Sequence, residues 1–135
     1  MTQKQFRVGT FNLNNLALPG FEFYGDQYSE AEYEQKLTWS ARQLDRMKSD
    51  IIGFQEVFQR EALQAVLAQT ETAQGHTLTM AKGGGGGPGL ALATRFPVVS
   101  HRIYTDFPKE SWLSLDADKA HIPLTKFSHP VLAVE

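Results

Sequence analysis

Two short runs of apolar, β-branched and aromatic residues predict buried strands in the first half of the chain. The first run covers residues 6–12, and the second covers residues 50–55. Such runs are typical of strands that lie inside a sheet. Polar residues stand where each strand leaves the core, with Asn12 at the first end and Glu56 at the second. The pattern therefore predicts two strands whose ends carry an amide and a carboxylate.

The segment between these strands predicts one long helix. Ser29 is a suitable N-cap, and Glu32 three residues later completes a capping box. Apolar residues then recur at spacings of four, four, three and three, which places them on one face of a helix that ends near Lys48. They are Tyr33, Leu37, Ala41, Leu44 and Met47. The positive charge of Lys48 also suits the negative end of the helix dipole.

The rest of the chain alternates between strand and helix patterns. The expected elements are a helix over residues 59–70, strands over 76–81, 90–94, 97–104 and 130–134, and an irregular stretch over 106–123. Such alternation predicts an α/β layer rather than an all-helical bundle.

Residues 82–89 contain five consecutive glycines. Glycine loses the most backbone entropy on folding, so the run favours no ordered element and predicts a flexible loop or linker. A phosphate cradle is the alternative interpretation, but such a cradle leads into a helix, and here a strand pattern follows. An engineered linker or a shortened loop fits the same residues.

The composition excludes some classes of function without choosing one. The chain has 135 residues, enough for one domain, of which 41% are hydrophobic and 21% charged. Its net charge of −2 offers no broad basic field for non-specific nucleic-acid binding. The absence of cysteine excludes disulfides and cysteine-type zinc sites. With no apolar signal segment near Met1 and no run long enough to span a membrane, we expect a cytoplasmic protein.

The polar strand ends form the candidate site. If the two strands are neighbours, Asn12 and Glu56 converge, and their oxygens suit Mg²⁺ or Mn²⁺, which keep waters that a substrate can replace. Asn14 faces the same side as Asn12 if the strand continues. The structural alternative makes Glu56 a solvent-facing or helix-capping carboxylate, and Asn12 an amide that ends its strand and bonds its own loop.

Three segments, in this order, resemble the endonuclease/exonuclease/phosphatase superfamily. They are the strand end Thr10-Phe11-Asn12, the strand end Gln55-Glu56 and the segment from Gly89 to Val98. The resemblance covers residues 6–99 and continues more loosely to residue 135. It implies the first half of the four-layer DNase I-like fold, in which a mixed, largely antiparallel sheet with helices on one face forms one layer of an α/β sandwich.

The same resemblance implies a metal-dependent phosphoesterase that hydrolyses a phosphodiester or a phosphomonoester. Glu56 would hold Mg²⁺ or Mn²⁺, and Asn12 would support the metal site as a second catalytic residue. Asn14 and Arg95 are further candidates for contact with the substrate phosphate. Within the family the substrates include nucleic acid (DNA or RNA), phospholipid head groups and inositol phosphates. The net charge of this chain argues mildly against a processive nucleic-acid binder.

Several parts of the family's machinery have no match in this sequence. The later Asp-x-Asn motif and the terminal Asp-His pair are absent. None of the four histidines, which are His76, His101, His121 and His129, occupies a family motif, and His129 is expected at the surface at the start of the last strand. Asp116 and Asp118 have metal-like spacing, but such spacings are common in solvated loops.

These gaps predict an incomplete enzyme. We expect the chain to be the N-terminal part of such a domain, weak or inactive alone, because hydrolysis also needs a group that positions the water and one that stabilises the leaving oxygen. A half-sheet leaves an apolar face uncovered, so self-association or a missing C-terminal half is expected to cover it. The alternative is a non-catalytic α/β interaction module that kept the fold.

Overall fold

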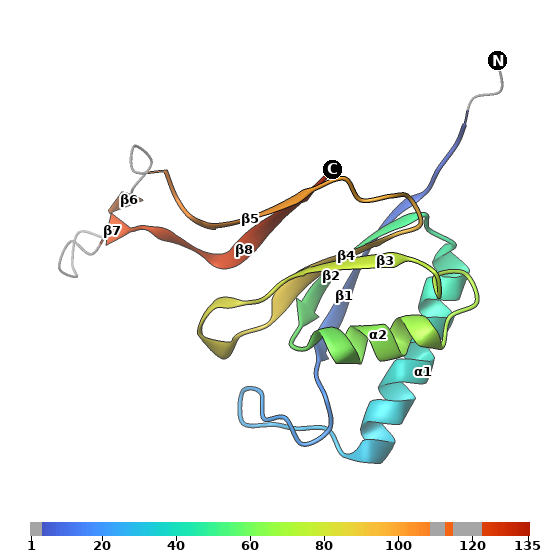
Figure 1. Ribbon diagram of the computed structural model, residues 1–135. Helices are drawn as coiled ribbons and strands as arrows, with labels where there is room; N and C mark the ends of the chain where they lie inside the picture. The colour runs from blue at the N-terminus through green and yellow to red at the C-terminus, as the bar shows by residue number, and fades with distance from the viewer. Residues whose placement is uncertain (1–3, 109–112, 115–122) are drawn as a thin grey trace.

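The computed structural model of the chain describes residues 4–108, 113–114 and 123–135. In chain order the elements are β1 (Val8–Leu16), α1 (Glu30–Met47), β2 (Ile51–Val57), α2 (Arg60–Ala68), β3 (Thr77–Ala81), the 3₁₀ turn η1 (Gly84–Gly86), β4 (Gly89–Thr94), β5 (His101–Asp106), β6 (Leu113–Ser114), β7 (Pro123–Leu124) and β8 (Lys126–Val134) (Figure 1). Asp116, Asp118 and His121 lie outside the described residues.

Four strands form one mixed sheet in the order β1-β2-β4-β3. β1 and β2 are parallel, with Val8 opposite Ile51 and Asn12 opposite Gln55. β4 is antiparallel to both β2 and β3. A parallel pair needs a crossover connection, which α1 supplies between β1 and β2. The expectation of an α/β fold with a mixed sheet is therefore confirmed.

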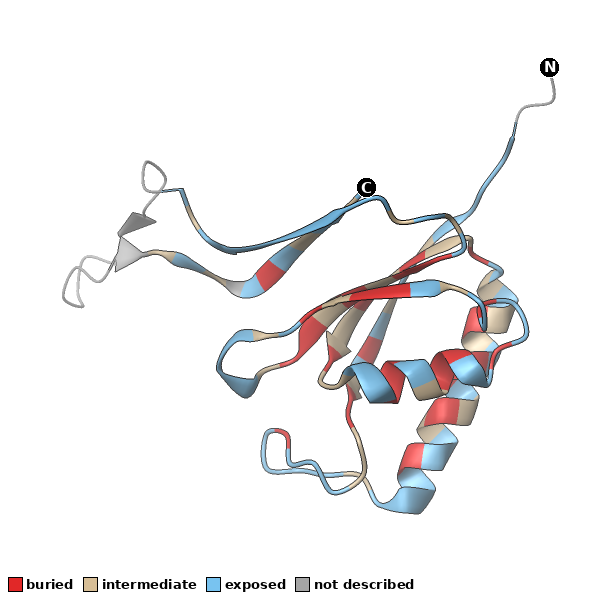
Figure 2. Cartoon of the chain, viewed as in Figure 1, coloured by how far each residue is buried: buried red, intermediate tan, exposed pale blue. Residues whose placement is uncertain are grey.

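Both helices lie on one side of this sheet, and the antiparallel β5–β8 hairpin lies on the other side, where β8 contacts β3 and β4 (Figure 1). Buried residues gather between the helices and the sheet (Figure 2). They include Leu13, Ile52, Phe54, Ala91 and Ala93 from the strands and Leu37, Leu44, Leu63 and Val66 from the helices. Most of the apolar core thus lies on the helical side of the sheet, while Thr79 and Ala81 are buried on β3 as well and every residue of β5 is exposed.

The capping signals place α1 as predicted. The side chain of Ser29 accepts a hydrogen bond from the N–H of Glu32, and the Glu32 carboxylate accepts one from the N–H of Ser29 at 2.8 Å. The helix ends at Met47, and its C-cap residue Lys48 adopts the left-handed conformation and donates its N–H to the carbonyl of Leu44. The two caps thus define where α1 begins and ends within the connection between β1 and β2.

Three strands differ most from the expected ranges, each by four residues at one end. β1 continues past residue 12 to Leu16, because Leu13 and Leu16 are both buried and Leu16 pairs again with Val57 after an irregular step. β5 begins at 101 rather than 97, and β8 begins at 126 rather than 130 because pairing with β5 extends to Lys126. The short β6–β7 pair lies in the stretch that was expected to be irregular.

The glycine run contains one tight turn and ends against the sheet. Gly85 and Gly86 have φ values of 62° and 78°, which glycine adopts without steric cost. A Cβ atom at Gly89 would collide with the backbone of Ala81 and Lys82, so only glycine allows this close approach. As expected, the run leads into a strand, β4, and not into a helix.

Candidate functional site

The carboxyl ends of β1 and β2 open into a cavity of about 460 Å³. Its lining residues are Asn12, Asn14, Asn15, Tyr24, Gln55, Glu56, Pro88, Gly89, Leu90 and His129. Because β1 and β2 are parallel neighbours, their ends fall at the same edge of the sheet. The structure therefore brings three of the four predicted site residues together: Asn12, Asn14 and Glu56.

The backbone is distorted at both strand ends. Asn14, Asn15 and Glu56 have φ values of 48°, 60° and 60°. Asparagine tolerates this left-handed conformation better than most residues, but for glutamate it is uncommon. The strand pairing is also irregular here, between Asn12 and Leu16 and on either side of Glu56. Such irregularities redirect side chains, and they recur next to active sites.

Hydrogen bonds hold these polar side chains in place. Asn12 Oδ1 accepts the N–H of Asn14 at 2.8 Å, which is the loop bond that the structural interpretation of Asn12 expects. Glu56 Oε2 accepts the N–H of Asn15 at 3.2 Å, so the carboxylate of one strand is tied to the backbone of the other. A carboxylate accepts about four such contacts and an amide oxygen two. These bonds therefore leave both groups able to hold a ligand.

A lysine and a tyrosine support the loop behind the site. Lys36 Nζ donates to the carbonyl of Asn14 at 3.0 Å, and the Tyr28 hydroxyl donates to the carbonyl of Asn15 at 2.9 Å. Burial lowers the pKa of Lys36, while the negative charge of Glu56 acts in the opposite direction. The carboxylate thus lies within electrostatic reach of a cation on α1.

His129 reaches the same cavity from β8. It lies inside the strand rather than at its start, and the hairpin carries it across to the strand ends. It is exposed, as expected, but sequence reasoning missed its place in the site, since no local motif surrounds it. Its two ring nitrogens can each take part in a hydrogen bond at this cavity.

Arg95 lies at the other end of the sheet. It follows β4, whose last residue, Thr94, pairs with Ile51 at the start of β2. Its guanidinium donates a hydrogen bond to Asp50 Oδ1 and lies 4.3 Å from the centre of the Phe96 ring. The hydrogen bond from the Arg7 N–H and then the one from Arg95 hold the pKa of Asp50 below its usual range. The structure therefore separates Arg95 from the other three candidates.

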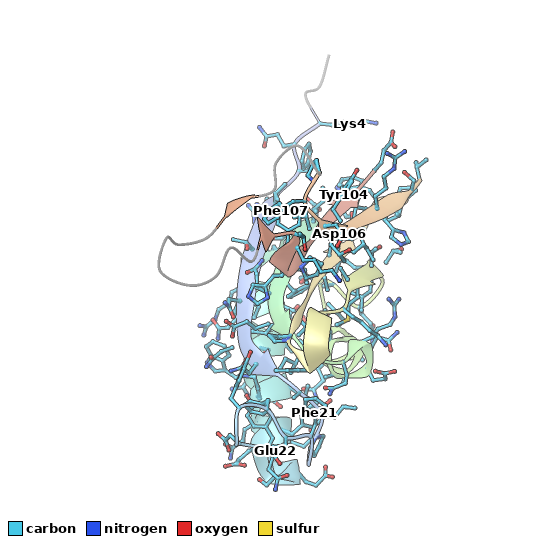
Figure 3. The ribbon with its side chains drawn as sticks, turned by 90° about the vertical axis from the view of Figure 1, so that its left-hand side faces the viewer. Lys4, Phe21, Glu22, Tyr104, Asp106 and Phe107 are labelled. Carbon is cyan, nitrogen blue, oxygen red and sulfur yellow. The ribbon has the colours of Figure 1, made fainter. Side chains whose placement is uncertain are left out.

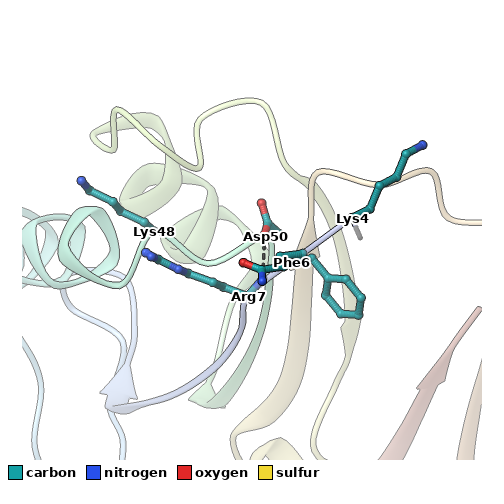
Figure 4. Close-up of a pocket in the computed structure, with 6 residues that line it drawn as sticks. Lys4, Phe6, Arg7, Lys48 and Asp50 are labelled. Atoms are coloured by element: carbon teal, nitrogen blue, oxygen red, sulfur yellow. Dashed lines mark hydrogen bonds between the residues drawn. The ribbon is translucent and has the colours of Figure 1, made fainter. Parts of the chain in front are cut away.

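A second cavity, of about 550 Å³, lies at this opposite end (Figure 4). It is lined by Lys4, Gln5, Phe6, Arg7, Lys48 and Asp50. The carboxylate of Asp50 already accepts the Arg7 N–H at 2.7 Å and pairs with Arg95. Although this cavity is larger, the carboxylate that lines it is already paired, whereas the Glu56 carboxylate at the strand-end cavity accepts the Asn15 N–H and keeps acceptor capacity.

The donor set of the strand-end cavity suits one kind of metal. Within the described residues, no three His, Asp or Glu side chains gather as a metal site of their own. Mg²⁺ is commonly bound through one or two carboxylates, with waters and substrate phosphates completing its shell. The Glu56 carboxylate and the Asn12 amide oxygen match that pattern, so the residues present fit Mg²⁺ or Mn²⁺ that is completed by substrate.

No protein-family model, curated protein or solved structure matches this chain. None of the helices in the described ranges is long and apolar enough to cross a membrane. What the structure itself defines is an α/β protein with a cavity at the carboxyl ends of two adjacent parallel strands, lined in part by polar side chains.

Proposed function

We propose that this chain is the N-terminal part of a Mg²⁺- or Mn²⁺-dependent phosphoesterase of the endonuclease/exonuclease/phosphatase superfamily, with the first half of a DNase I-like fold. The observation that carries the proposal is the convergence of Asn12 and Glu56 at the adjacent ends of β1 and β2. The order of the sequence motifs supports it. The reaction is hydrolysis of a phosphodiester or a phosphomonoester.

Each residue of the cavity has a role in this proposal. Glu56 and Asn12 hold the metal, which when bound neutralises the charge that develops on the phosphoryl oxygens. Asn14 donates its side-chain amide to a phosphate oxygen. His129 moves a proton at the attacking water or at the leaving oxygen, the task that a general acid or base performs. Lys36 keeps the loop of Asn14 in place through its hydrogen bond to that carbonyl.

The proposal also includes a missing half. Across the described residues, the cavity contains one carboxylate, from Glu56, and one imidazole, from His129. Large apolar side chains remain exposed on β1 and on the hairpin, with Val8 67%, Ile103 44% and Val131 42% accessible. Such surfaces favour association. A second copy or a C-terminal half would cover them and complete the catalytic groups.

Metal binding and hydrolysis test the proposal together. The first measurement is Mn²⁺ binding by electron paramagnetic resonance, and the second is metal-dependent hydrolysis of bis-(p-nitrophenyl) phosphate. We expect Glu56→Gln to weaken Mn²⁺ binding at least tenfold and to abolish any turnover. The matched control is Glu61→Gln, which changes an exposed carboxylate on α2 and leaves both measurements unchanged. Equal Mn²⁺ binding by wild type and Glu56→Gln would contradict the proposal.

A non-catalytic interaction module is the second candidate, and the exposure of every residue in β5 favours it. In that case the role of Glu56 is structural, and its carboxylate accepts the hydrogen bond from the Asn15 N–H without binding a metal. Glu56→Gln would then change stability without changing metal affinity. The Mn²⁺ measurement therefore separates the two candidates even if the isolated chain has no activity.

A further inference from the structure

The loop between β1 and α1 presents one aromatic ring at the strand-end cavity. Tyr24 lines this cavity, and 77% of the residue is exposed. Its φ of 51° places it in the left-handed region, inside a turn that two backbone hydrogen bonds between Phe23 and Asp26 close at 2.8 and 2.9 Å. Figure 3 shows the neighbouring Phe21 and Glu22 at the end of the molecule opposite Lys4. A large ring is thus held out into solvent beside polar groups.

Other aromatic rings hold the turn from behind. Phe58, just after β2, lies 5.3 Å from Phe21, 5.7 Å from Phe23 and 6.3 Å from Tyr24, measured between ring centres. Phe23 is buried and also packs against Tyr28 at 5.0 Å. The contact between Tyr24 and Phe58 is edge-on. Because Phe58 directly follows the strand that carries Glu56, this contact ties the Tyr24 ring to the strand end beside the candidate metal site.

We infer that Tyr24 is a stacking platform for a planar ring that is joined to the phosphate ester at Asn12 and Glu56. The substrate is then a nucleotide, free or within a single strand. This inference rests on the proposed function, and it narrows the substrate class left open there. A nucleotide carries its base and its phosphate on the two sides of one sugar, so one molecule can contact both the ring and the strand ends. The cavity of about 460 Å³ lies within the range of roughly 300–1,000 Å³ that small-molecule sites occupy.

The other substrate classes of the family fit the lining of this cavity less well. A quaternary ammonium head group is typically held in a cage of several rings, whereas Tyr24 is the one Phe, Tyr or Trp side chain among the described lining residues. An inositol phosphate has no planar face to stack. A duplex buries its bases, and no lysine or arginine of the described residues lines the cavity to hold a long polyanion. Base stacking on an aromatic ring needs none of these features and accepts any base.

Binding measurements with four small probes test the inference without requiring turnover. The probes are adenosine 5′-monophosphate, ribose 5-phosphate, choline phosphate and a tetrathymidylate strand, each titrated in the presence of Mg²⁺. We expect the adenosine nucleotide to bind about tenfold more tightly than ribose 5-phosphate, as expected for one stacked base. Tyr24→Ala should remove this preference, and Tyr24→Phe should keep it. Tighter binding of the tetrathymidylate than of the adenosine nucleotide would indicate single-stranded nucleic acid as the substrate, and weaker binding would indicate a free nucleotide.

The control variant is Tyr104→Ala, which removes a tyrosine of β5 that is 46% exposed and lies outside the cavity. It should leave all four affinities unchanged. Equal or absent binding of the adenosine nucleotide and ribose 5-phosphate would overturn the inference, as would tighter binding of choline phosphate. A third result would separate the two proposals. If the preference for the base depends on Tyr24 and persists in Glu56→Gln, and if the wild type hydrolyses no phosphate ester, the nucleotide site is upheld and the proposed catalysis is rejected.

Discussion

Replacing Glu56 by glycine and by alanine tests the left-handed geometry of the candidate site. The residue has a φ of 60°. At this φ the Cβ atom of alanine approaches a backbone carbonyl, which costs about 1–2 kcal/mol, and glycine avoids that cost. Both substitutions lose the same hydrogen bond to the Asn15 N–H, so this loss cancels when the two variants are compared. The comparison therefore isolates the backbone conformation.

The expected difference follows from two opposing effects. Glycine avoids the ~1–2 kcal/mol steric cost, but its more flexible unfolded chain costs ~0.4–1 kcal/mol relative to alanine. Glu56→Gly should therefore be more stable than Glu56→Ala by about 0.5–1 kcal/mol. Urea unfolding followed by circular dichroism measures the free energy of unfolding of each variant.

A matched pair at Glu34 provides the control. This residue is exposed in the second turn of α1, where alanine should be more stable than glycine by about 1 kcal/mol. The order of the two variants should thus reverse between position 34 and position 56. If alanine is the more stable replacement at both positions, Glu56 does not adopt the left-handed conformation, and the strain argument for this site fails.

Three further predictions concern stability. Phe54→Ala, at a side chain that is 1% exposed, should cost about 3–5 kcal/mol in urea unfolding, and a loss below 1 kcal/mol would contradict the packing. Ser29→Ala should lower the free energy of unfolding by about 1 kcal/mol. The double variant with Glu32→Ala should lose less stability than the two single variants added together, and thermal melting of all three variants measures this. Because Arg7 and Arg95 lower the folded-state pKa of Asp50, its stabilising contribution is present above the usual aspartate pKa and is lost as the pH falls below about 4. Asp50→Asn should thus lose less stability than wild type between pH ~5 and ~3, and identical pH profiles would refute this.

Local signals in the sequence were sufficient for α1. The Ser29 and Glu32 pair forms the capping box that the sequence predicts, and the apolar stripe faces the core. These features depend on residues three or four positions apart. A short-range pattern therefore carries all the information needed for both ends of the helix.

The candidate site was predictable in part. The apolar runs located β1 and β2, and the parallel pairing that the argument required is present. The end of β1 was predicted at residue 12, too early, because Asn14 reads as a loop residue although burial of Leu16 resumes the pairing. Arg95 was placed by its motif, but the antiparallel course of β4 carries it away from Glu56.

The remaining wall of the cavity depends on tertiary structure. His129 reaches the cavity because β8 contacts β3, β4 and the turn η1, which lie far from it in the sequence. Tyr24 reaches it because several rings pack around Phe58. Neither arrangement has a periodic or short-range signature, so no local pattern groups these two residues with Asn12 and Glu56.

The paired asparagines after residue 13 also affect how this molecule meets its neighbours. β1 is an edge strand of the sheet, and its regular pairing runs from Val8 to Asn12 before the left-handed residues interrupt it. An uninterrupted edge is a template on which strands of other molecules can add, the first step toward fibrous aggregates. The break at Asn14 and Asn15 leaves only a short template, so replacing both with β-branched residues should promote edge-to-edge aggregation. The turn that shapes the cavity thus also helps to keep neighbouring molecules apart.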